Sequence, residues 1–224
     1  MRDAETSALE TLRSGFLYLS AAMAMLIAVV EFAPAVFTHV SPSVGIMVFF
    51  TLLPSIIVAF LYAVFWKIRP GMRQLSEADS RFRVCYTGTT LMLVGFAILA
   101  LLTLVGLTIL MARLVVEAGS PPMRSAVIGA LTFFGAFLIG GIIAFTGYVL
   151  TFVVGGFKLC GKYRNPLYAV AAILLILGAL SASAEPLWLA AASAARLGRI
   201  LTAVGYVLTY AALDGTIKKL NAQS

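Results

Sequence analysis

Charged side chains are scarce in this chain. Only 11% of its 224 residues are charged, and 62% are hydrophobic. A soluble globular domain usually carries about 25% charged and about 45–50% apolar residues. With a mean hydropathy of +1.04, the chain has too few polar side chains to cover a water-soluble core. The composition therefore excludes an ordinary soluble domain and predicts that lipid surrounds much of the surface.

Residues that carry out chemistry are also few. The chain has one histidine, His39, and two cysteines, Cys85 and Cys160, which form neither a zinc-ligand pattern nor a disulfide framework. No HExxH or GxSxG motif is present, and Glu31 is the one candidate acid inside an apolar block. General acid–base catalysis therefore has little to use. We expect no catalytic residues, no metal and no cofactor, and we expect that the protein is not an enzyme.

The apolar residues gather in long blocks with short polar segments between them. A helix needs roughly 20 residues to cross about 30 Å of hydrocarbon. The blocks predict an all-α, polytopic transmembrane helical bundle with six spans. The predicted spans cover residues 15–37, 44–66, 84–111, 125–154, 166–183 and 198–213. The last span is the shortest, so five spans stay open as an alternative.

Several local signals predict where helices begin, bend and end. Pro54 predicts a kink in the second span, and Pro70-Gly71 predicts a turn after it. Ser76, followed by two acids, is typical of a helix N-cap. Residues 184–197, which include Trp188, predict a short helix at the membrane surface. Asp214 and the glycine after it predict the end of the last helix.

Lysine and arginine are unevenly distributed between the two sides of the predicted bundle. Twelve of the 16 lie on the side that holds the N-terminus. Because cytoplasmic loops are enriched in Lys and Arg, both termini are predicted to be cytoplasmic. The chain then divides into a cytoplasmic segment over 1–14, a single transmembrane domain over 15–213 and a cytoplasmic tail over 214–224. We expect a multi-pass protein of the cell membrane.

The basic loops on this side are candidates for contact with anionic lipid headgroups. They contain no contiguous basic face interleaved with aromatic residues, so we expect membrane lipids rather than nucleic acid as the partner. The candidate headgroup contacts are Lys67, Arg69, Arg73, Lys158, Lys162 and Arg164.

Two further features lie within the predicted spans. A carboxylate such as Glu31 costs roughly 2.5–3.5 kcal/mol at the membrane centre. One interpretation is a proton or cation site; the other is an interfacial acid, or an acid hydrogen-bonded by a neighbouring helix. The small residues Ala136, Gly140 and Ala144 lie four apart and predict a stripe where another helix approaches closely, in the core or in an oligomer contact.

Three segments of the chain resemble a known family. They read ALETLRSGFLYLSAA at the first span, LSEADSRFRVCYTGTTLMLVG at the third and FKLCGKYRNPLYAVAAILLILG at the fifth. In this order they resemble DUF973, an archaeal family of uncharacterised multi-pass membrane proteins. The resemblance implies an archaeal source and a multi-span helical fold, and it implies no activity, ligand or site residue.

Two classes of function stay open. The scarcity of ionisable residues within the spans favours a structural or accessory membrane component that binds lipids, forms a homo-oligomer or joins a larger membrane complex. The alternative is a small transporter or channel, with a polar path near Glu31 and Pro54.

Overall fold

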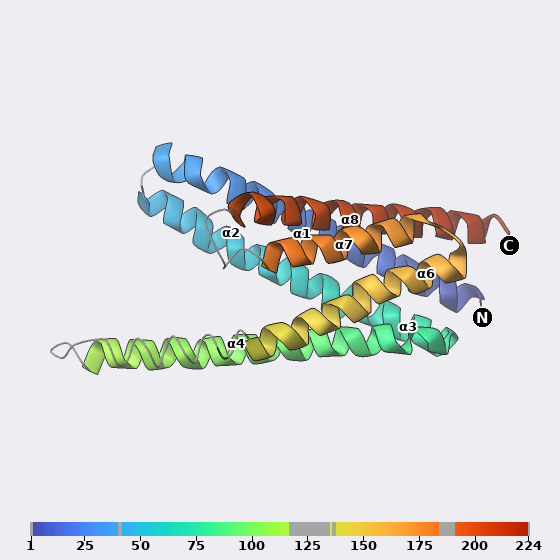
Figure 1. Cartoon of the computed structure of the whole chain (residues 1–224), viewed down its shortest axis with the longest axis horizontal. Helices are drawn as coiled ribbons and strands as arrows, with labels where there is room; N and C mark the ends of the chain where they lie inside the picture. The colour runs from blue at the N-terminus through green and yellow to red at the C-terminus, as the bar shows by residue number, and fades with distance from the viewer. Residues whose placement is uncertain (1, 40–41, 117–134, 136–137, 184–190, 224) are drawn as a thin grey trace. The chain divides into compact units, whose positions relative to one another are not determined.

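A computed structural model describes residues 2–39, 42–116, 135, 138–183 and 191–223. Within these ranges nearly every residue is helical and none forms a strand. The predicted all-α bundle is therefore confirmed. The elements in chain order are α1 (Arg2–His39), α2 (Pro42–Tyr62), the π-helix η1 (Ala63–Ile68), α3 (Arg69–Ala78), the 3₁₀ turn η2 (Ser80–Phe82), α4 (Arg83–Val116), the π-helix η3 (Val149–Val154), α6 (Gly155–Tyr163), α7 (Leu167–Ser183) and α8 (Ala191–Asn221) (Figure 1).

The π-helices join shorter elements into long helices. Both residues that flank η1, Tyr62 and Arg69, have right-handed helical backbone angles. The chain therefore continues from α2 through η1 into α3 without leaving the helical conformation. In the same way, helical residues 138–148 continue through η3 into α6.

Five helical segments are long and apolar enough to cross a membrane, which supports a multi-pass membrane protein. The sixth apolar helix, α7, is shorter, with 17 residues. The five long segments are Ala4–Phe32, Pro54–Ala78, Ser80–Gly106, Leu138–Tyr163 and Ser193–Asn221.

The shortest span is therefore not the one that the sequence predicts. Residues 198–213 lie within α8, which has 31 residues and is among the longest helices described. Residues 191–197, predicted as part of a surface helix, are its first two turns, and Trp188 lies outside the described residues. Asp214 does not end α8 either, since the helix continues to Asn221. The prediction was wrong because it treated charged residues as limits of the span.

The loop after the second span also differs from the prediction. Pro70 and Gly71 lie in the first turn of α3, directly after the π-helix η1, and the chain stays helical through both residues. Ser76 lies near the end of α3 and does not cap the next helix; its hydroxyl donates to the Arg73 carbonyl at 2.7 Å. The residue that starts the next turn is Asp79, whose side chain accepts from the Arg81 amide.

The chain forms two compact units. Unit 1 comprises Met1–Tyr86 with Phe152–Ser224, and unit 2 comprises Thr87–Thr151. The predicted limits at residues 14/15 and 213/214 fall inside α1 and α8. The single transmembrane domain over 15–213 stays a prediction.

The core of unit 1 is built from α1, α7, α8 and the helix that contains η3. Phe16, Phe152 and Tyr206 are buried together, with ring centroids 5.7–6.1 Å apart. Helices α7 and α8 lie side by side (Figure 1). They touch closely at Gly178, where an added Cβ would lie 2.3 Å from the Thr202 hydroxyl oxygen.

Unit 2 brings α4 and the helix through residues 138–151 into backbone contact. A Cβ added at Gly95 would lie 2.3 Å from the Ala144 amide nitrogen, and one at Gly147 would lie 2.3 Å from that of Met92. Gly140 lies against Leu99 in the same way. Two members of the predicted stripe, Gly140 and Ala144, thus face α4, while Ala136 lies outside the described residues.

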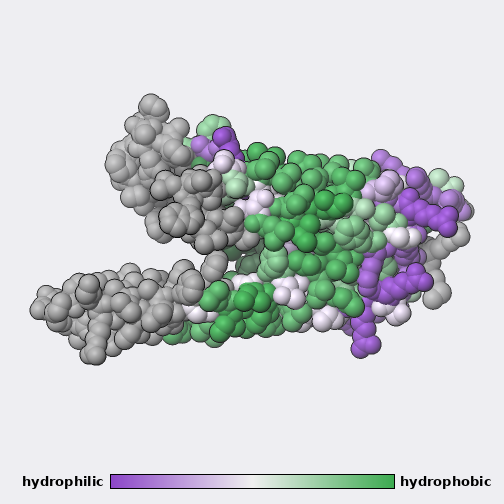
Figure 2. Space-filling model, viewed as in Figure 1, coloured by the Kyte–Doolittle hydropathy of each residue, from purple (hydrophilic) through white to green (hydrophobic). Residues whose placement is uncertain are grey.

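Hydrophilic residues gather at the end of unit 1 where α1 begins and α8 ends, next to a hydrophobic belt (Figure 2). Both chain termini belong to this end (Figure 1). We call it the charged end. Shared placement of the termini fits an even number of spans, and the cytoplasmic orientation of this end stays a prediction.

Candidate functional site

Two ion pairs join α1 to α8. At the charged end, Arg13 Nη1 lies 2.8 Å from Asp214 Oδ1. Further along the helices, Arg196 Nη2 lies 2.8 Å from Glu31 Oε2. In each helix the two charged residues are 18 positions apart, or about 27 Å at 1.5 Å per residue. This spacing is close to the roughly 30 Å thickness of the hydrocarbon layer.

Glu31 therefore has a cationic partner within the bundle. Its side chain is 27% exposed and its carboxylate binds the Arg196 guanidinium. An acid held in this way fits a structural role better than it fits an isolated proton site. Arg196 was not predicted as its partner, because the residues around Arg196 predict a surface helix. The available signal was the charge order: Arg13 then Glu31 in one helix, and Arg196 then Asp214 in the other.

A second cluster at the charged end connects α1, the α3–η2 turn and α6. Lys162 Nζ lies 3.0 Å from Glu5 Oε1 and 3.4 Å from Asp79 Oδ2. The Tyr163 hydroxyl donates to the same Glu5 oxygen at 2.5 Å. Lys162 Nζ also lies 5.5 Å from the centroid of the Phe82 ring, within the range of a cation–π contact. The Lys162 charge is thus balanced within the protein.

Asp79 stabilises the turn that leads into α4. Its Oδ1 accepts a hydrogen bond of 3.0 Å from the Arg81 amide, as a helix N-cap does. That hydrogen bond, and then the Lys162 ammonium, hold the pKa of Asp79 below its ordinary value. Lys158 Nζ donates to the Arg81 carbonyl oxygen, so α6 contacts both sides of this turn.

The six predicted headgroup contacts are not equivalent. Lys158 and Lys162 are engaged as described above. Arg73 Nε lies 2.9 Å from Glu77 Oε1 in an exposed pair, and the Arg69 guanidinium lies 5.9 Å from the centroid of the Tyr86 ring.

Lys67 and Arg164 differ from the other four. In the part of the chain that the structure describes, neither forms an ion pair, a side-chain hydrogen bond or a cation–π contact, whereas each of the other four forms at least one of these. Arg164 ends α6 with a left-handed backbone angle, φ 51°, and its side chain is exposed. Lys67 is half-buried in η1. These two cations are the ones best placed to meet a partner outside the protein.

An exposed group of aromatic side chains lies next to Lys67. We call Tyr18, Tyr62, Phe65 and Trp66 the aromatic cluster. The rings of Tyr62 and Trp66 are stacked with centroids 5.6 Å apart, and Tyr18 meets Tyr62 edge-on at 5.3 Å. The aromatic cluster was not predicted from the sequence, although Tyr62 and Trp66 are four residues apart on one helix face.

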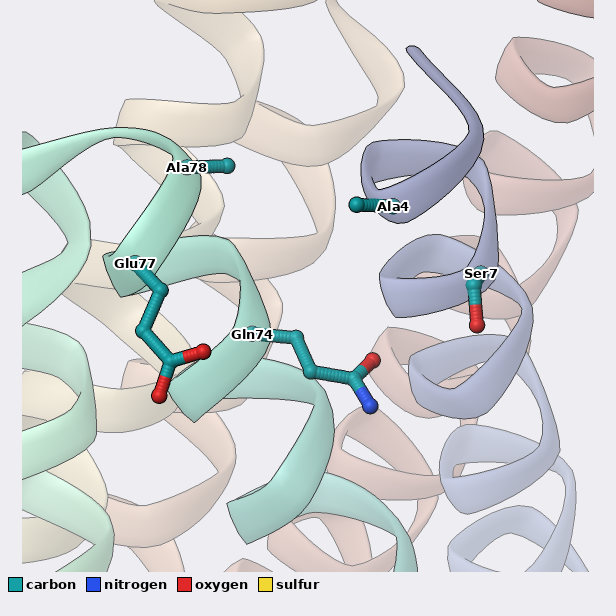
Figure 3. Close-up of a pocket in the computed structure, with 5 residues that line it drawn as sticks. All are labelled: Ala4, Ser7, Gln74, Glu77 and Ala78. Atoms are coloured by element: carbon teal, nitrogen blue, oxygen red, sulfur yellow. The ribbon is translucent and has the colours of Figure 1, made fainter. Parts of the chain in front are cut away.

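A shallow cavity lies between α1 and α3 at the charged end. Its volume is about 430 Å³, and it is lined by Ala4, Ser7, Gln74, Glu77 and Ala78. Figure 3 shows the Gln74 side chain reaching from α3 towards α1. The lining offers one amide, one hydroxyl and a carboxylate that Arg73 already contacts. Among the described residues, no group of three His, Cys, Asp or Glu side chains is placed to hold a metal ion.

Comparison with known proteins adds one finding. A family model described as "Protein of unknown function (DUF973)" matches residues 5–224. Comparison with curated proteins and with solved structures found no match.

Proposed function

The chain belongs to the DUF973 family, whose function is unknown, and we propose a role from its geometry: a structural or accessory membrane component that binds anionic lipid headgroups at its charged end. The observation that carries this proposal is the position of two unpaired basic residues next to apolar helical stretches: Lys67 follows the uncharged stretch 42–66, and Arg164 follows the candidate span Leu138–Tyr163. Lys67 and Arg164 have no acidic partner within the described chain, whereas Arg73 and Lys162 do. Cations at this level attract anionic lipids by about 1 kcal/mol each.

Three further statements complete the proposal. The charged end faces the cytoplasm, because Lys and Arg are enriched on that side of cell membranes. The protein acts without catalysis or cofactor and does not bind nucleic acid. It works as a homo-oligomer or as part of a larger membrane complex, in which exposed apolar residues such as Leu101, Ile142 and Val207 meet lipid or a neighbouring subunit.

Lipid-dependent thermal stability tests this role. The purified protein is placed in vesicles of phosphatidylcholine alone or with phosphatidylglycerol, and its melting temperature is measured. We expect the anionic lipid to raise the melting temperature of the parent. The combined variant Lys67→Gln with Arg164→Gln should lose most of that increase. Arg73→Gln, which changes a cation already paired with Glu77, is the matched control and should keep it. Equal responses in all three proteins would contradict the proposal.

A transporter or channel with a polar path near Glu31 and Pro54 is the alternative. It is favoured by the contact of a carboxylate and a guanidinium, Glu31 and Arg196, between two helices that are long and apolar enough to cross a membrane. Proteoliposomes loaded with a pH-sensitive dye decide between the two roles. Proton or cation flux in the parent that disappears in Glu31→Gln supports the transporter. Absence of flux in the parent above empty vesicles supports the accessory role.

A further inference from the structure

We propose that the aromatic cluster and Lys67 together form a binding seat for one anionic lipid. In this seat the stacked rings of Tyr62 and Trp66 contact the glycerol region and the first carbons of the acyl chains, and Lys67 binds the phosphate. The inference rests on the proposed lipid-binding role and names the site at which it is carried out.

The distribution of charge places the cluster at a membrane boundary. Between Pro42 and Trp66 the chain has no charged residue, and Lys67 is the first charge after this stretch. On α1 the same holds between Arg13 and Glu31. The aromatic cluster thus lies where an uncharged helix surface meets the first basic residue. Tryptophan and tyrosine are enriched at this level of membrane proteins because their rings are apolar and their edges polar.

Packing between α1 and η1 places Gly15 and Lys67 at the same level of the bundle. A Cβ added at Gly15 would lie 3.0 Å from the Lys67 Cβ and 2.5 Å from the Ile68 Cδ1. Gly15 is two residues beyond Arg13, whose guanidinium pairs with Asp214. The start of the Lys67 side chain is therefore level with the ion pair at the charged end. Its Cβ lies against α1 at Gly15, and the flexible stem beyond it can carry the ammonium towards water or phosphate.

The rings of the aromatic cluster lie on the surface of the protein and not in its core. Trp66 is 63% exposed and Phe65 is 42% exposed, although Trp66 stacks on Tyr62 and Tyr62 is held edge-on by Tyr18. Contacts with Tyr18, from a different helix, fix the stack in place. A preformed apolar surface with an adjacent cation matches the two parts of a lipid headgroup region, and a purely apolar partner would leave Lys67 unpaired.

Quenching of tryptophan fluorescence by brominated lipids tests the seat. Trp66 and Trp188 are the two tryptophans, so Trp188→Phe makes Trp66 the single reporter. Two bromine positions are compared, near the glycerol end and near the methyl end of the acyl chains. We expect stronger quenching from the glycerol-end position. Stronger quenching from the methyl-end position, or none from either, would overturn the proposal. If Trp188→Phe does not fold, the difference between the parent and Trp66→Phe gives the same measurement.

The same reporter measures lipid selectivity. Brominated phosphatidylglycerol and phosphatidylcholine compete at Trp66, and their relative binding constant is obtained from the quenching. We expect a preference of about fivefold for the anionic lipid, the ratio for one cation at an anionic surface. Lys67→Gln should bring the ratio close to one, and Arg73→Gln should leave it unchanged. An unchanged ratio in Lys67→Gln overturns the seat. The proposed function is judged separately, by whether anionic lipid raises the melting temperature of the parent more than that of the combined variant Lys67→Gln with Arg164→Gln.

Discussion

At the scale of single residues, the charged side chains of α1 and α8 matter as pairs. Glu31 and Arg196 lie about 27 Å from the Arg13–Asp214 pair, near the opposite border of the hydrocarbon layer, where a lone charge costs less than the roughly 2.5–3.5 kcal/mol that it costs at the membrane centre. Held 2.8 Å apart, each supplies the other's counter-charge. The stabilisation thus comes from the pair, and neither residue alone predicts it from the sequence.

Exchange of the two charges tests this pairing. Glu31→Gln or Arg196→Gln leaves one charge without its partner, and because the Arg196 side chain is 63% exposed we expect either to lower the stability by about 1 kcal/mol or less. The double exchange Glu31→Arg with Arg196→Glu restores an ion pair and should recover most of the loss. The measurement is the melting temperature in mild detergent. If the double variant is as unstable as the sum of the single exchanges, the pair is not the cause.

Asp79 predicts an acid response at the charged end. Its carboxylate is stabilised by the Arg81 amide and by Lys162, with Glu5 on the other side of that lysine. Because these contacts lower the pKa of Asp79 in the folded state, its contribution to stability is complete above its ordinary pKa, about 3.9. That contribution is lost as the pH falls through the lower, folded value.

The corresponding measurement is the melting temperature as a function of pH. Below about pH 4 we expect the parent to lose stability more steeply than Asp79→Asn, which has no such carboxylate to protonate. Glu77→Gln is the control. Glu77 belongs to the same segment, but its exposed pair with Arg73 should contribute little, so this variant should follow the parent. Parallel curves for the parent and Asp79→Asn would contradict the role of Asp79.

Individual helices show which parts of the fold the sequence can predict. Length and hydropathy identify six apolar helices, since about 20 apolar residues have few alternatives to a membrane helix. Helix ends are harder to predict. Asp214 and Arg196 look like interruptions in the sequence, yet α8 continues past both because Arg13 and Glu31 neutralise them. The aromatic cluster and the cavity at Gln74 form from separate helices, and no local pattern brings those helices together.

The contact between the two helices of unit 2 depends on the glycines where they meet. Gly95→Ala or Gly147→Ala places a methyl group 2.3 Å from a backbone nitrogen of the facing helix. We expect each to cost about 1–3 kcal/mol, as overpacking does. At Gly141 an added Cβ meets nothing within 4 Å, so Gly141→Ala should be neutral or stabilising by up to about 1 kcal/mol. Denaturation with sodium dodecyl sulfate measures the difference, and equal effects at all three positions would contradict the proposed contact.

The molecule as a whole is predicted to lie in the membrane with its charged end in the cytoplasm. Cysteine labelling from either side checks this orientation. In a variant that lacks Cys85 and Cys160, a cysteine at Ser76 should react only from the cytoplasmic side. A cysteine at Glu117, which lies outside the described residues, should react only from the opposite side. The reverse pattern would show that the orientation is wrong, while the bundle itself would stand.

The order of charges on α1 and α8 has a consequence for membrane insertion. The two helices run in opposite directions, and this direction pairs Arg13 with Asp214 and Glu31 with Arg196. If α8 entered the membrane the other way round, Arg13 would meet Arg196 and Glu31 would meet Asp214, and both contacts would repel. A shift of one helical turn, about 5.4 Å, would break both pairs together. The ion pairs with α1 therefore favour one direction and one depth of α8 in the membrane.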